Sequence, residues 1–224
     1  MAVPTLRRRG RPPEDTQVAS LRARAWYRCC VLESGAPNAA ALAKMFRTGP
    51  FDERRSWERY ASGKSLPSEI KKNSPAIVAR VAQRFPRTLR VYASPLWIII
   101  RNDHVFGVAE TNELLWQLDR EVWAPFFSTD KNGQFTRNWS YIQHEIWNEP
   151  KPALILDYLA AYLLLLKEAR MLGHHQVEKS AEPWTQWALT RLPSCPILEE
   201  LADELSALIV ERMQITAPDT RLFT

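Results

Sequence analysis

Apolar residues recur at three- and four-residue spacing along most of this chain, which is the pattern of amphipathic helices. In the first half the spacing predicts four short helices, at about residues 17–32, 39–46, 52–60 and 77–85. Gly35 is expected to end the first helix because glycine readily adopts a left-handed backbone. Asn38 is expected to cap the second, and Pro86 to close the fourth. No segment between residues 17 and 85 shows a convincing strand-like alternation of apolar and polar positions.

The second half continues the helical pattern. Residues 95–100 form an apolar run that periodicity alone cannot assign to helix or strand, and we favour a helix because its neighbours are helical. Further helices are predicted at 111–123, 140–147, 152–172 and 198–213, the third being the longest. Pro152 suits the first turn of that helix, and Gly173 suits its end. We therefore predict an all-α fold, with residues 91–224 forming a Trp-rich helical domain.

The composition argues against a membrane or secreted protein. The most apolar run, residues 153–166, contains Asp157 and is shorter than the roughly 20 apolar residues needed to cross a bilayer. Arg7, Arg8 and Arg9 are not followed by the apolar stretch of a secretory signal. The three cysteines form no CxxC pair and no disulfide framework. We expect a cytoplasmic protein without a membrane partner.

Charge divides the chain in two. Residues 1–90 carry 19 Lys and Arg against 7 Asp and Glu, a net charge of +12, whereas residues 91–224 carry 11 against 18, a net charge of −7. Such asymmetry suggests that one part meets a polyanion. Nucleic acid is the commonest polyanion, and binding to its phosphates is driven by counterion release. The alternative is that the basic surface is merely solvated.

A motif inside the basic half points the same way. Leu42-Ala43 is followed 14 residues after Ala43 by Trp57-Glu58, and then by Gly63-Lys64 and Pro67-Ser68. This spacing resembles the helix-turn-helix of the lambda-repressor/Cro-like (XRE) family over residues 17–85. The turn glycine falls two positions late, at Gly49, and three extra residues precede Gly63.

The resemblance implies a DNA-binding helix-turn-helix bundle over residues 17–90, with residues 52–60 as the recognition helix. That helix would present Arg54, Arg55 and Arg59 to DNA, where arginine reads guanine or grips phosphate. Tyr60 and Lys64 complete the predicted nucleic-acid site. The alternative for the arginines is a solvated basic face. Trp57 is expected to anchor the helix in a small core, and Gly63 to allow a sharp exit.

Residues 1–16 are predicted to be a flexible basic arm. Arg7 and Arg8 precede Arg9-Gly10-Arg11-Pro12, which resembles the core of an AT-hook and implies insertion into an A·T-rich minor groove. Generic phosphate contact, or no role at all, remain alternatives. Lys71 and Lys72 are equally consistent with contacts to the nucleic-acid backbone and with ordinary surface lysines.

Catalytic and metal chemistry find little support in the sequence. Its four histidines, His104, His144, His174 and His175, do not form an HExxH motif. Neither a GxSxG motif nor a phosphate-binding GxxxxGK[ST] loop is present. We expect no enzyme, no metal site and no cofactor.

Two functions remain. The first is a DNA-binding transcriptional regulator, in which residues 91–224 serve oligomerisation, partner binding or effector sensing, with a homodimer expected and the helix at 198–213 as candidate interface. The alternative is an assembly subunit of a larger nucleoprotein complex, of phage, mobile-element or defence origin, with little sequence specificity.

The tryptophans of the acidic half either build its core or line a pocket or interface.

Overall fold

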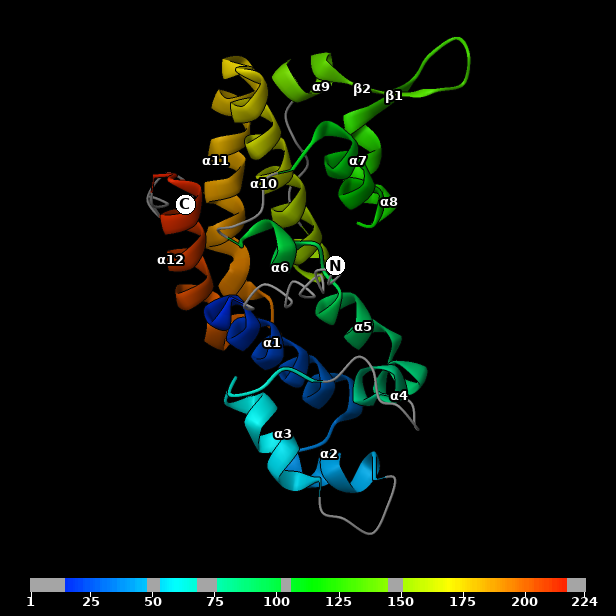
Figure 1. Ribbon diagram of the computed structural model, residues 1–224, viewed down its shortest axis with the longest axis vertical. Coiled ribbons are helices and arrows are strands. Elements are labelled where there is room, and N and C mark those ends of the chain that lie inside the picture. Colours follow the sequence, from blue (N-terminus) through cyan, green and yellow to red (C-terminus); the bar gives the residue numbers. More distant parts are fainter. Residues whose placement is uncertain (1–14, 48–52, 68–75, 102–105, 145–150, 217–224) are drawn as a thin grey trace, which may run out of the picture.

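The computed structural model describes residues 15–47, 53–67, 76–101, 106–144 and 151–216, and Figure 1 shows their arrangement. The predicted all-α fold is confirmed: the described chain is mostly helical, and its β-structure is one two-stranded hairpin. Within these residues, no helix combines the length and apolarity that a membrane span requires.

Four of the five N-terminal helices follow the predicted pattern, and the fifth was not predicted. The five helices are α1 (Thr16–Ser34), α2 (Ala39–Met45), α3 (Arg54–Ala61), α4 (Ile77–Arg84) and α5 (Pro86–Tyr92). Gly35 ends α1 with φ +67°, and the Asn38 side chain caps α2 by accepting from the amide of Ala41. Pro86 follows α4 and also begins α5, where its missing N–H has no intrahelical partner to lose.

The C-terminal part contains seven helices in the described chain. They are α6 (Leu96–Ile99), α7 (Val108–Trp116), α8 (Arg120–Trp123), α9 (Trp139–His144), α10 (Ile155–Leu172), α11 (His175–Arg191) and α12 (Ala202–Met213). Short 3₁₀ turns lie at residues 124–126, 152–154, 192–194 and 199–201. Strands β1 (Phe127–Thr129) and β2 (Phe135–Arg137) pair antiparallel, and their hairpin projects from the helical body.

Several local predictions for this part were right and others were wrong. Residues 95–100 do contain a helix, and Gly173 ends α10. The single helix predicted at 111–123 is two helices, because the Asp119 side chain caps α8 by accepting from the amide of Glu121. The hairpin and α11 were not predicted, and α1, with 19 residues, is one residue longer than α10.

Two hydrophobic cores share α1. The smaller core gathers Trp57, Leu42 and Val81 around α2, α3 and α4, and α1 contributes Trp26 and Cys30 to it. The larger core surrounds α10, and α1 contributes other residues, Val18, Leu21, Ala25 and Cys29, to that core. Opposite faces of one helix therefore support both parts of the molecule.

Ion pairs join α1 to α12 and to the turn before it. Arg24 pairs with Glu204, Arg28 Nη1 lies 2.8 Å from Glu200 Oε1, and Asp15 pairs with Arg212. Residue numbers rise along α1 as they fall along α12, so the two segments run antiparallel. Glu200 and Glu204 are therefore counter-ions of α1.

The apolar stripe of α12 is also used within the molecule. Its residues Leu205, Leu208, Ile209 and Met213 are at most 3% exposed and belong to the larger core. The sequence-based choice of residues 198–213 as the oligomer interface is therefore wrong for this stripe. A hydrophobic stripe alone does not distinguish an intramolecular core from an intermolecular one.

A buried ion pair ties the hairpin to the helices. Arg137 Nη2 lies 2.9 Å from Glu168 Oε2 on α10 and 2.6 Å from Asn112 Oδ1 on α7. The two charged side chains are only 7% and 1% exposed. Removing one partner would leave a charge without compensation in the interior, so this pair fixes where β2 sits.

Candidate nucleic-acid interface

One side of α3 is anchored in the small core. Trp57 is fully buried, and its ring stacks on that of Trp26 with centroids 5.4 Å apart and planes inclined by 10°. The ring of Phe46 lies 5.9 Å from Trp57 on the α2 side. The predicted role of Trp57 as a core anchor is confirmed, and this anchoring turns the opposite side of α3 outward.

The outward side of α3 is basic. Arg54, Arg55 and Arg59 are all exposed, together with Glu58. Arg54 Nε lies 2.7 Å from Glu58 Oε1, so one of the three charges is compensated on the helix itself. Arg55 and Arg59 are one turn apart and therefore project side by side. In the described residues, no carboxylate lies within ion-pair distance of either guanidinium.

Lys64 and Tyr60 differ in their positions. Lys64 is exposed and follows the end of α3, and we name it with Arg54, Arg55 and Arg59 the α3 basic face. Tyr60 is half-buried, its ring packed edge-on against Trp26 and Trp57 at 5.7 and 5.9 Å. Burial raises the pKa of Tyr60 above its ordinary value. Tyr60 thus lies at the border of the core, beside the basic face.

Gly63 fixes the course of the chain after α3. Its φ of +69° lies in the left-handed region, as the predicted sharp exit requires. A Cβ at this position would lie 2.1 Å from Ser20 Oγ on α1. The end of α3 therefore lies so close to α1 that a side chain at position 63 would require the Ser20 side chain to move.

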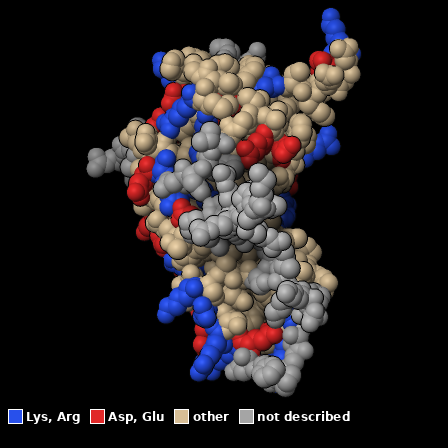
Figure 2. Space-filling view, in the orientation of Figure 1, with Lys and Arg blue, Asp and Glu red and all other residues tan. Residues whose placement is uncertain are grey.

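The α3 basic face differs from other basic residues of the first half. Arg24, Arg28 and Arg90 are paired with carboxylates of the second half, so part of the charge asymmetry is used inside the molecule. Lys and Arg side chains gather over α3 at the lower left of Figure 2. This is the part of the basic half whose arginines Arg55 and Arg59 remain available to an external anion.

The connection between α2 and α3 spans residues 46–53. Helix-turn-helix motifs typically use about three to four residues there. Five of the residues between α2 and α3, 48–52, lie outside the described part of the chain. Other elements of the sequence prediction lie outside the described residues: Arg7, Arg8, Arg9 and Arg11 of the arm, Gly49-Pro50, and Lys71 and Lys72.

An exposed group of aromatic rings lies at the other end of the molecule. Trp116 on α7 and Phe135 on β2 are 47% and 59% exposed. Phe127 lies between them, with ring centroids at 5.8 Å from Trp116 and 6.5 Å from Phe135. Trp123, Trp139 and Trp184, in contrast, pack against the larger core. The acidic half thus uses its tryptophans mainly inside, with Trp116 as a clear exception.

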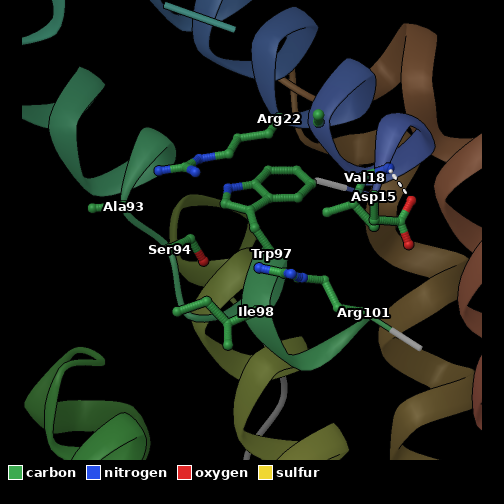
Figure 3. Close-up of a pocket in the computed structure, with 9 residues that line it drawn as sticks. Asp15, Val18, Arg22, Ala93, Ser94, Trp97, Ile98 and Arg101 are labelled. Atoms are coloured by element: carbon green, nitrogen blue, oxygen red, sulfur yellow. Dashed lines mark hydrogen bonds between the residues drawn. The ribbon is translucent and has the colours of Figure 1, made fainter. Parts of the chain in front are cut away.

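A small cavity lies where α1 meets α6 (Figure 3). Its volume is about 90 Å³, and Arg22, Trp97 and Arg101 contribute to its lining. Arg22 Nε donates to the Tyr92 carbonyl at 2.7 Å, and Trp97 Nε1 donates to the Val91 carbonyl at 2.8 Å. The Arg22 bond holds α1 against the end of α5, and the Trp97 bond holds α6 to α5; sequence periodicity gave no sign of either role.

Within the described chain, no three His, Cys, Asp or Glu side chains gather as a metal ion would require. Cys29 and Cys30 are buried, and desolvation raises the pKa of the Cys29 thiol to about 12, which opposes reactivity as a thiolate. Comparison of the chain with models of protein families, with curated proteins and with solved structures found no match.

Proposed function

We propose that this protein is a DNA-binding regulator that contacts duplex DNA through the α3 basic face. The observation that supports this most directly is the pair Arg55 and Arg59, exposed one turn apart on a helix whose other side is locked by Trp57. A rigid helix carrying uncompensated guanidinium groups is suited to a polyanionic partner. The basic arm, with Arg7, Arg8, Arg9 and Arg11, would add phosphate or minor-groove contacts.

The dimensions of α3 agree with this mode of binding. The helix has eight residues, and an α-helix with its side chains is about 10–12 Å in diameter. The major groove of B-DNA is about 12 Å wide and admits a helix. In the proposed complex Arg55 and Arg59 contact bases or phosphates, and Lys64 contacts the phosphate backbone. The half-buried Tyr60 packs behind them.

A second function is favoured by two other observations. The turn glycine of a helix-turn-helix falls two positions late in the sequence, at Gly49, and Glu58 compensates one arginine of the face. Both features suit a grip on phosphate charge better than base reading. In addition, the exposed Trp116 and Phe135 offer a protein-binding surface. Together these would serve an assembly subunit that binds any duplex within a larger nucleoprotein complex.

The test compares two double variants of the full chain. Arg55→Ala/Arg59→Ala removes two charges from the α3 basic face, and Arg120→Ala/Lys131→Ala removes two exposed charges from the acidic half. Fluorescence anisotropy measures the affinity for labelled duplex DNA over a range of salt concentrations. If both arginines contact phosphates, the first variant lowers the salt slope by about 2, at about 0.9 per contact, and the control leaves it unchanged. Equal affinities for the two variants would refute the proposal.

Selection from a random duplex pool at physiological ionic strength separates the two functions. A regulator enriches a defined motif, because specific binding exceeds non-specific binding by at least about 10³-fold. An assembly subunit retains bulk duplex without a motif. Recovery of no duplex at all would refute both.

A further inference from the structure

The hairpin of β1 and β2 extends beyond the helical body (Figure 1). Each strand has three residues. Asp130 Oδ1 fixes the turn between them by accepting from the amides of Asn132 and Gln134, both at 2.8 Å. A two-stranded hairpin is by itself only marginally stable in water, and a further strand stabilises it. The molecule therefore presents a preformed turn whose short strands are suited to additional pairing.

The ladder of hydrogen bonds shows which main-chain groups of β2 point outward. The amide of Asp130 donates to the carbonyl of Gln134 at 2.9 Å, so these two residues form a bonded pair. Bonded and non-bonded pairs alternate along an antiparallel ladder. Phe135 and Arg137 therefore belong to non-bonded pairs in the register of the two strands. Their N–H and C=O groups point away from β1.

The outer edge of β2 is open in the part of the chain that the structure describes. There the main-chain groups of Phe135 and Arg137 make no hydrogen bond to a described residue. The outer edge of β1 is partly used, because the amide of Phe127 donates to the carbonyl of Ala124. Unpaired N–H and C=O groups at the edge of a sheet are a template for another extended chain. Of the two edges, β2 offers the more complete template.

The two faces of the hairpin differ in their chemistry. Phe135 is 59% exposed, and its ring packs edge-on against those of Phe127 and Trp123, at 6.5 and 6.2 Å. On the opposite face the exposed hydroxyl groups of Ser128 and Thr136 lie 3.1 Å apart, at hydrogen-bond distance. Successive side chains of a strand point to opposite faces. A chain that extends this sheet should therefore alternate apolar and hydroxyl side chains, because like neighbours of these kinds stabilise adjacent strands.

The exposed aromatic area is too small for a stable interface between two copies of the chain. Trp116 and Phe135 are 47% and 59% exposed. Aromatic side chains have about 150–250 Å² each to bury, so the two rings leave roughly 200 Å² uncovered. Stable interfaces bury about 800 Å² on each partner. A single extended segment needs less apolar area, because its main-chain hydrogen bonds supply affinity.

We propose that β2 binds an extended segment of a partner protein, which pairs antiparallel with the outer edge as a third strand. The segment's residue opposite Phe135 exchanges main-chain hydrogen bonds with it and lays an apolar side chain beside its ring. The residues next to it in the segment present hydroxyl groups beside Thr136. This inference rests on the protein-binding part of the second proposed function and names the kind of segment that is bound. Because it involves no residue of α3, it is tested without DNA, and its failure would leave the measurements of DNA binding unchanged.

The test uses two isomeric peptides that alternate isoleucine and threonine, with a lysine at each end for solubility. One peptide carries N-methyl groups on its isoleucine amides, and the other carries them on its threonine amides. In the proposed pairing the isoleucine amides point toward β2 and the threonine amides point away from it. Methylation of isoleucine therefore removes the donors that β2 requires, whereas methylation of threonine leaves them in place.

Nuclear magnetic resonance titration of the ¹⁵N-labelled full chain measures the affinity of each peptide. We expect the threonine-methylated peptide to bind saturably, at least tenfold tighter than its isomer, and to shift the amide signals of Phe135 and Arg137. It should also slow the hydrogen exchange of the Phe135 amide, which has no acceptor in the described chain. Equal affinities, the reverse order, or no saturable binding of either peptide would overturn the proposal.

Two variants locate the peptide on the hairpin. Phe135→Ser removes the exposed ring and should weaken binding about threefold or more. Lys131→Ala changes an exposed residue of the turn without altering the edge of β2, and it should leave the affinity unchanged. Circular dichroism shows whether each variant folds. The comparison of the two peptides uses the unaltered protein, so misfolding of a variant does not affect it. Unchanged affinity in a folded Phe135→Ser variant would overturn the assignment.

Discussion

The close approach of α3 to α1 gives a prediction whose magnitude follows from the structure. Gly63 has φ +69°, and a Cβ there would lie 2.1 Å from Ser20 Oγ and 3.1 Å from Ser20 Cβ and Arg24 Cδ. Gly35 has nearly the same φ, +67°, and nothing lies within 4 Å of its Cβ position. Replacing each by alanine therefore imposes the same backbone strain, but only the first adds a steric clash.

The expected costs differ accordingly. A left-handed backbone costs an L-residue roughly 1–2 kcal/mol, so Gly35→Ala should lower the free energy of unfolding by about that amount. Overpacking adds typically 1–3 kcal/mol, which brings Gly63→Ala to about 2–5 kcal/mol. Ser20→Ala removes the hydroxyl that is nearest to the added methyl group. In the Ser20→Ala background the penalty of Gly63→Ala should therefore shrink, although the contacts at 3.1 Å remain.

Urea denaturation followed by circular dichroism measures these free energies for the wild type, the three single variants and the double variant. Gly35→Ala controls for backbone strain, and Ser20→Ala controls for any role of the hydroxyl itself. Equal penalties at Gly63 and Gly35 would refute the reasoning from steric contact. A penalty at Gly63 that is the same with and without the Ser20 hydroxyl would show that the strain lies elsewhere.

Two further predictions concern the anchors of α3 and α1. Trp57→Ala should lower the free energy of unfolding by about 3–5 kcal/mol. Trp116→Ala, at a site that is 47% exposed, should lower it by less than about 1 kcal/mol. Similar costs for the two variants in urea denaturation would contradict the core role of Trp57. Burial of the Asp15 carboxyl raises its pKa, but the Arg212 side chain and the amide of Val18 outweigh this effect. The pKa of Asp15 therefore lies below its ordinary value of 3.8. A carboxyl with a lowered folded-state pKa stabilises the fold above its ordinary pKa, and this contribution is lost as pH falls through the lowered value. In the Asp15→Asn variant, asparagine can still cap α1 but cannot pair with Arg212. The difference in unfolding free energy between wild type and this variant should therefore shrink as the pH falls. A difference that does not change with pH would refute the role of the Arg212 pair.

Local chemistry explains which parts of the fold could be predicted from the sequence. Gly35 and Asn38 mark helix ends because their conformational and hydrogen-bonding preferences act within a few residues. The same kind of signal was overlooked at Asp119, whose carboxylate begins α8 and divides a continuous apolar pattern in two. In α11 the signals conflict, because Pro183 lies inside the helix and predicts a break there. Strands of three residues are too short for an alternating pattern to stand out.

Long-range pairing explains what could not be predicted. The acidic residues Glu200 and Glu204 look like a solvated helix face until α1 brings Arg28 and Arg24 to them. At the candidate site, the sequence identified Arg54, Arg55, Arg59 and Lys64 on an exposed surface, but only tertiary packing shows that Tyr60 turns toward Trp26. Hydrophobic periodicity and helix-end signals act over a few residues, so they cannot predict ion pairs between residues 170 or more positions apart, such as Arg24 and Glu204.

The position of α1 has a consequence for how such a protein can evolve. Ala25 and Trp26 are adjacent in the chain, yet they belong to different cores. A fragment beginning at residue 91 would lack Val18, Leu21, Ala25 and Cys29 from its interior, and a fragment ending at residue 90 would expose them. Exposed apolar surface of this kind favours aggregation. Recombination between genes should therefore transfer this molecule as one heritable unit, and exchange of either half alone would require a replacement for α1.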